Sequence, residues 1–137
     1  MRSNGGLPID LLGNILITLL VLQLVWQYAL RFGKDTIGNP RVPQYYQNHG
    51  IREIVLSATL AGIMLVCAWR TQATSLDLVL LTLAGTGLVG SYWVAVAFVG
   101  LGRQFPEDDS DDLVPHVNHA IQAVVLVLAL GLKWASA

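Results

Sequence analysis

Four long apolar runs divide this sequence and limit what it can fold into. They cover residues 7–30, 51–69, 76–101 and 113–134, and each approaches or exceeds the ~20 residues that a helix needs to cross a bilayer. A helix satisfies its own backbone hydrogen bonds inside lipid. A membrane barrel would instead need alternating segments of about ten residues, which this sequence lacks. The runs therefore predict an all-α integral membrane protein, a single domain over residues 1–137 built as a bundle of four transmembrane helices.

The composition excludes several classes of protein. Charged residues make up 12% of the chain, about half the share found in soluble domains, which is too few for a disordered chain. Eight Lys and Arg residues stand against nine Asp and Glu, and without a basic tract a nucleic-acid partner is disfavoured. The single cysteine, Cys67, excludes an internal disulfide or a cysteine-cluster metal site. We expect the lipid bilayer to be the main surroundings of this chain.

Basic residues between the runs and at their ends predict the orientation, because loops rich in Lys and Arg face the cytoplasm. The basic residues of the two larger loops are Arg31, Lys34, Arg41, Arg52 and Arg103, and those of the opposite side are Arg2, Arg70 and Lys133. Five against three predicts cytoplasmic larger loops, with the N- and C-termini extracytoplasmic.

The segment Gly85–Gly90 matches the dinucleotide-binding pattern G-x-G-x-x-G letter for letter. That pattern works where a strand turns into a helix at an aqueous site, whereas here it lies in the middle of an apolar run. Small residues in membrane helices let two helices pack closely. We interpret this segment, and Ala58, Ala61 and Gly62 in the second run, as helix-packing residues.

The three histidines form the most informative polar set. His49 precedes the second run, while His116 and His119 open the fourth and share one helix face. The predicted topology places all three at one membrane surface, together with Glu53 and Asn118. Imidazole and carboxylate groups are ordinary ligands of Zn, Cu, Fe or Ni. The histidines are therefore candidate ligands of a metal or a pigment such as haem, or alternatively bind headgroups, water or loop carbonyls.

The polar residues that we assign to the interior of the runs are uncharged, which disfavours an ion path or proton relay. Hydrogen bonding between helices is the usual role of such residues. Gln23 and Gln27 lie one turn apart, and Gln122 lies on the His119 side of the fourth run, so all three could face an interior cavity. Cys67 is expected to be an inert packing residue.

Two stretches resemble the membrane-associated eicosanoid and glutathione metabolism family. One is Gln47–Glu53, an Asn- and Arg-bearing run that ends in a glutamate at the start of the second helix. The other combines Gly90–Ser91 with Phe98–Arg103 in the third run. In that family an arginine stands at the position of Ser91 and a tyrosine at the position of Phe98.

The resemblance implies a trimer of four-helix protomers that binds glutathione between protomers near the cytoplasmic face. Asn48, Glu53 and Arg103 would be its ligand-binding residues here. Asn48 and Glu53 stand two residues farther apart than the family pattern has them.

Three functions remain open from the sequence. The first is a non-catalytic accessory or structural subunit of a membrane complex, because no Ser, Cys or carboxylate stands in a nucleophile or acid–base pattern. The second is a divergent family member that binds glutathione or a lipid. The third is a subunit that holds a metal or pigment on its histidines. The expected partners are other membrane subunits, or copies of itself in a homotrimer.

Overall fold

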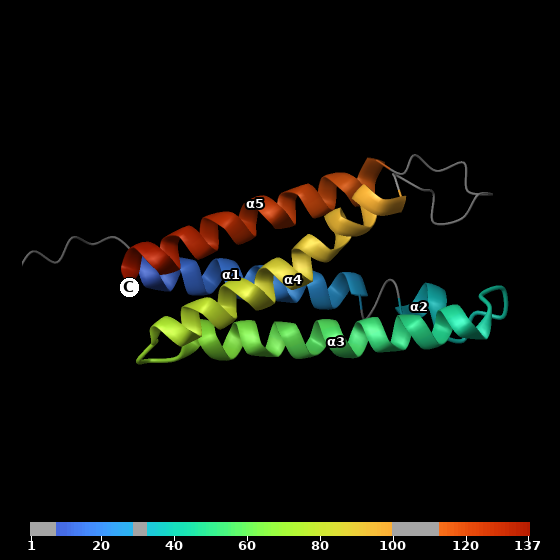
Figure 1. Cartoon of the computed structure of the whole chain (residues 1–137), viewed down its shortest axis with the longest axis horizontal. Coiled ribbons are helices and arrows are strands. Elements are labelled where there is room, and N and C mark those ends of the chain that lie inside the picture. Colours follow the sequence, from blue (N-terminus) through green and yellow to red (C-terminus); the bar gives the residue numbers. More distant parts are fainter. Residues whose placement is uncertain (1–7, 29–32, 100–112) are drawn as a thin grey trace, which may run out of the picture.

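The computed structural model describes residues 8–28, 33–99 and 113–137. Within these ranges the chain is helical and contains no strand (Figure 1). The helices are α1 (Ile9–Val25), α2 (Gly33–Thr36), α3 (Gln44–Trp69), α4 (Ser75–Val99) and α5 (Leu113–Ser136). All except the short α2 are long and apolar enough to cross a membrane. The prediction of an all-helical chain with four such helices is confirmed.

The four long helices form an antiparallel bundle. α1 packs against α5 and α3, and α4 packs against α3 and α5, so α1 lies diagonally across from α4, and α3 across from α5. We call the end where α1 begins and α5 finishes the lysine end. The opposite end, where α1 finishes and α5 begins, is the histidine end. α2 packs beside the start of α3 at the histidine end (Figure 1).

α3 begins at Gln44 rather than near residue 51, where the apolar run starts. Its first turns are polar, so hydropathy alone does not reveal them. Gln47 ties these turns to the preceding loop: its Oε1 accepts from the Gly38 amide at 3.0 Å, and its Nε2 donates to the carbonyls of Asn39 at 3.0 Å and Val42 at 2.8 Å. Gly38 has a φ of +76°, a left-handed conformation that favours glycine.

The middle of the bundle is an apolar core. Its fully buried members include Ile17 of α1, Met64 of α3 and Leu81 of α4. Gly85 lets α4 approach α5 closely, because a Cβ at Gly85 would lie 2.6 Å from Leu126 Cδ1. The packing interpretation is thus confirmed for Gly85 and for buried Ala61, as it is for Cys67 in the same core.

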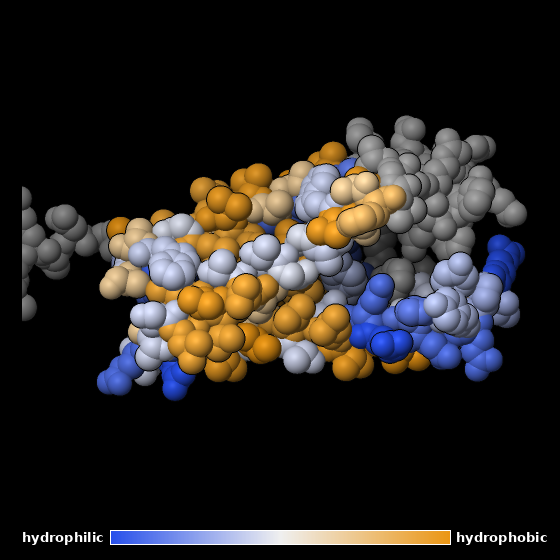
Figure 2. Space-filling model, viewed as in Figure 1, coloured by the Kyte–Doolittle hydropathy of each residue, from blue (hydrophilic) through white to orange (hydrophobic). Residues whose placement is uncertain are grey.

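The outer surface of the bundle is also apolar over its middle. Figure 2 shows hydrophobic side chains along the centre of the bundle, with hydrophilic ones gathered toward its ends. Leu22, Val66, Leu83 and Val127, one from each long helix, are all exposed. A surface that is apolar all round is typical of helices in contact with lipid or with other transmembrane helices.

A buried lysine holds the lysine end together. The side chain of Lys133 is only 2% exposed, although its place at the end of the fourth apolar run predicts a charge at the membrane surface. Its Nζ donates to Asp10 Oδ1 at 2.5 Å, to Asn14 Oδ1 at 2.9 Å and to the Ala68 carbonyl at 3.2 Å. All three ammonium donors are therefore used, and they join α5 to α1 and α3.

The turn between α3 and α4 is closed by a second ion pair. Arg70 Nη1 lies 2.9 Å from Asp77 Oδ1. Asp77 also accepts from the Thr74 amide at 2.7 Å, while its own amide donates to Thr74 Oγ1 at 3.3 Å. These reciprocal bonds between a Thr and an acidic residue three positions later satisfy backbone donors at the start of α4.

We expect Lys133→Met to destabilise the bundle by about 2 kcal/mol. Breaking a fully buried ion pair costs roughly 3–5 kcal/mol, but the Asp10 side chain is 54% exposed and can regain water. Arg70→Met is the matched control. It leaves Asp77, whose side chain is 5% exposed, still bonded by the Thr74 amide and hydroxyl, so we expect a smaller loss. Thermal unfolding in detergent compares the two variants. Equal losses of stability would contradict the conclusion that Lys133 holds α5 to α1 and α3.

Candidate functional site

Seven polar side chains meet at the histidine end. We call them the histidine cluster, and its members are Gln23 and Gln27 of α1, Tyr92 of α4, and His116, Asn118, His119 and Gln122 of α5. Their positions follow from helix periodicity, which brings residues three or four apart onto one face. Gln27 lies in a wider π-helical turn at residues 26–28 that ends α1, and such turns are frequent at functional sites.

Gln27 is the hub of this cluster. Its Oε1 accepts from Asn118 Nδ2 at 2.9 Å and from Gln122 Nε2 at 2.6 Å. Its Nε2 lies 3.0 Å from His119 Nε2. Gln23, one turn earlier on α1, donates to Asn118 Oδ1 at 2.5 Å. Gln23, Gln27 and Gln122 thus make the hydrogen bonds between helices that are the usual role of such residues, and they contact α1 and α5 side chains rather than line an open cavity.

Tyr92 connects the two histidines of α5. Its ring stacks on His119 with the ring centroids 3.6 Å apart and the planes at 15°. Its hydroxyl hydrogen-bonds to His116 Nδ1. The expectation that His116 and His119 share one helix face is therefore confirmed. That face turns toward α4 and α1.

Two buried polar atoms of the cluster have no hydrogen-bond partner, His119 Nδ1 and Gln122 Oε1. His119 is 4% exposed and Gln122 is fully buried. A neutral imidazole nitrogen donates or accepts according to the tautomer, while an amide oxygen accepts. Both residues lie on one face of α5, three positions apart, so their unsatisfied atoms belong to the same part of the cluster.

The other predicted site residues lie elsewhere or outside the described residues. His49 makes an edge-to-face contact with Tyr45 near the start of α3, with the ring centroids 4.5 Å apart and the planes at 68°. Asn48 and Glu53 are exposed on α3. Within the described residues the backbones of α3 and α5 do not come close, and Lys133 reaches the Ala68 carbonyl of α3 at the opposite, lysine end. Arg103 falls outside the described residues. The structure therefore joins His116, His119 and Asn118 but not His49 or Glu53.

The described residues contain no group of three His, Cys, Asp or Glu side chains that could hold a metal ion. Within the histidine cluster, His116 Nδ1 and His119 Nε2 already hydrogen-bond to protein side chains, those of Tyr92 and Gln27. The assignment of His49, His116 and His119 to a metal or pigment stays a prediction from the sequence.

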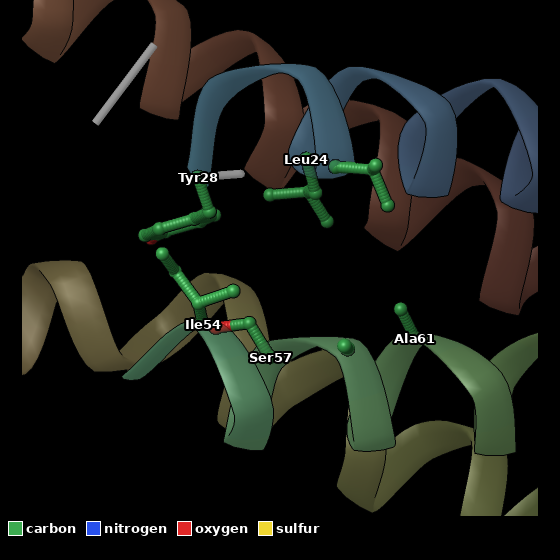
Figure 3. Close-up of a pocket in the computed structure, with 7 residues that line it drawn as sticks. Leu24, Tyr28, Ile54, Ser57 and Ala61 are labelled. Carbon is green, nitrogen blue, oxygen red and sulfur yellow. The ribbon is translucent and has the colours of Figure 1, made fainter. Parts of the chain in front are cut away.

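A small apolar cavity lies between α1 and α3. Figure 3 shows Leu24 and Tyr28 of α1 pointing toward Ile54, Ser57 and Ala61 of α3. Its volume of ≈60 Å³ is far below the ~300 Å³ at which small-molecule sites begin.

A polar cavity of ≈380 Å³ lies at the lysine end, beside Asp10, Arg70 and Lys133. These charged side chains are already engaged in ion pairs, so the cavity has no unpaired buried charge with which to hold a ligand. Unpartnered buried polar atoms occur instead in the histidine cluster. We therefore take the histidine cluster as the candidate site.

Tyr92 is the site residue that the sequence analysis missed. It lies between Ser91 and Trp93 in an apolar run, where nothing local distinguishes it from a packing aromatic. The signal lies in the antiparallel pairing of α4 with α5. The contact of Gly85 with Leu126 fixes the pairing, and seven residues later on α4 it brings Tyr92 opposite His119.

No family model matches this chain, and neither curated proteins nor solved structures show a significant match to it.

We expect Gln27→Met to destabilise the bundle about three times as much as Gln23→Met. Gln27 bonds three partners on α5 and Gln23 bonds one, and hydrogen bonds between membrane helices contribute about 0.6 kcal/mol each. The expected losses are therefore roughly 2 and 0.6 kcal/mol, measured by unfolding in mixed detergent. Equal losses would show that Gln27 is not the hub.

Proposed function

We propose that this chain is a multi-pass integral membrane protein that acts as a non-catalytic accessory or structural subunit of a larger membrane complex. The support comes first from where its chemistry lies. The polar side chains of the histidine cluster bind one another, and those of the lysine end are paired within the bundle. Such pairing stabilises a bundle and leaves few reactive groups for catalysis.

The main support for the proposal is the open space beside two glycines on the outside of the bundle. A Cβ at Gly62 of α3 would meet nothing within 4 Å, and one at Gly87 of α4 would meet only Leu60 Cδ1 at 4.0 Å. Both glycines are exposed. Glycine lowers helix stability by about 1 kcal/mol relative to alanine, and in membrane helices it commonly lets another helix approach. We infer that outward glycines receive transmembrane helices of a partner.

The proposed orientation follows the basic residues of the loops. We place the histidine end in the cytoplasm, because the loop between α1 and α3 carries Arg31, Lys34 and Arg41. The lysine end would then face the opposite side. The burial of Lys133 removes one of the three basic residues counted against this orientation.

The test compares Gly87→Leu with Gly85→Leu in the full-length protein extracted in mild detergent. A leucine at Gly87 is expected to leave the unfolding temperature unchanged and to reduce co-purifying membrane subunits at least fivefold. A leucine at Gly85 would clash with Leu126, and overpacking a core costs about 1–3 kcal/mol. This variant therefore reports damage to the bundle itself.

Three results would contradict the proposal. A pure homotrimer that binds glutathione would favour the resemblance to the glutathione-metabolism family. A visible absorption band or a stoichiometric metal would favour a cofactor-holding subunit. A monomer whose behaviour Gly87→Leu does not change would leave the outward glycines without a role in assembly.

A further inference from the structure

Gln27, His119 and Gln122 form a group of three neighbouring side chains that we call the polar ring. Gln27 bonds the other two and so joins α1 to α5. Gln122 donates to Gln27 at 2.6 Å, and Gln27 contacts His119 Nε2 at 3.0 Å. The third side of the polar ring lies between Gln122 and His119, which are three residues apart on α5. Residues three apart share a helix face, and these two each contribute a buried polar atom, His119 Nδ1 and Gln122 Oε1, that has no hydrogen-bond partner.

The two glutamines always present unlike groups to His119. Each amide has a C=O end and an NH₂ end, and Gln27 and Gln122 are bonded through one end of each. A donor must meet an acceptor there, so their remaining ends are also unlike. Exchanging the oxygen and nitrogen of both amides, an ambiguity common at such sites, gives the same result. His119 therefore faces one donor and one acceptor.

This arrangement fits only a neutral imidazole. A neutral ring has one donor and one acceptor nitrogen, whereas an imidazolium has two donors. A protonated His119 would place one of its N–H groups against the NH₂ group of one of the two glutamine amides. Either the Gln27 bond to α1 would break, or a buried N–H would be left without an acceptor, which costs free energy.

We propose that Gln27, His119 and Gln122 are a protonation-sensitive latch between α1 and α5. The latch is closed when His119 is neutral and opens when His119 takes up a proton. It acts within one chain, so it holds whether or not the protein is a subunit of a complex.

The other titratable groups near the latch come from three helices. On α4, Tyr92 stacks on His119, and on α5, His116 bonds the Tyr92 hydroxyl. Tyr28 follows Gln27 in the turn that ends the first long helix. No carboxylate of the described residues hydrogen-bonds to His119, and the acidic segment 107–112 lies outside them. The side-chain amides of Gln27 and Gln122 are thus the polar groups that face His119.

The decisive variant is Gln122→Glu in the full-length protein in lipid vesicles. A carboxylate presents two acceptor oxygens, so Gln27 must turn its NH₂ toward Glu and its C=O toward His119. His119 would then face two acceptors, which fits the imidazolium. Nitrogen-15 NMR of the imidazole at pH 7 is expected to show at least a tenfold larger doubly protonated fraction than in the wild type.

Gln23→Glu is the matched control. It adds the same charge to the same cluster but bonds Asn118 rather than His119, so we expect less than a twofold change. An equal effect of both variants would mean that charge alone governs His119 and would overturn the latch. A His119 that stays neutral in Gln122→Glu would overturn it as well.

Hydrogen exchange tests the opening and does not require Gln122→Glu to fold. On acidification, amides of residues 23–28 in the wild type should exchange at least tenfold faster after correction for the intrinsic pH dependence. His119→Phe keeps a ring against Tyr92 and should abolish that increase, whereas His49→Gln should retain it. An increase that persists in His119→Phe, or a wild type whose His119 protonates without faster exchange, would refute the latch.

Discussion

The pairing of polar side chains between α1 and α5 is the constraint on which the bundle depends. A polar group left unpaired in apolar surroundings costs several kcal/mol, so each such group must find its partner before the bundle is stable. Asp10 and Asn14 bind Lys133 at one end, and Gln27 binds His119 and its neighbours at the other. Because both ends must pair at once, a slide of α5 along α1 by one turn would leave both sets unpaired.

The number of long helices and their apolar character follow from hydropathy, which needs no tertiary information. Periodicity also predicts that His116 and His119 share a face, because residues on one side of a helix recur every three to four positions. Uncharged polar residues inside apolar runs predict hydrogen bonds between helices, which Gln23, Gln27 and Gln122 make. The structure agrees on each of these points. Local spacing reveals which residues share a face.

Local spacing does not reveal which helix lies opposite that face. Tyr92 belongs to the site only because α4 pairs with α5, and Lys133 resembles a boundary charge until α1 is seen to supply its acceptors. The glycines near the centre of α4 have different roles for the same reason. Gly85 packs against Leu126, whereas Gly87 faces outward. His49 precedes the second apolar run at the expected level, yet α3 lies diagonally across from α5, which separates His49 from the other two histidines.

We expect the four long helices to cross a bilayer and to place the two polar ends of the bundle on opposite sides. Single cysteines introduced at Gln44, Thr71 and Ser136 in a Cys67→Ala background test it by labelling with an impermeant thiol reagent in sealed vesicles. Thr71 and Ser136 lie at the lysine end and Gln44 at the histidine end. We predict that the cysteines at 71 and 136 label from one side of the vesicle membrane and the cysteine at 44 only from the other. Labelling of all three from the same side would contradict this topology.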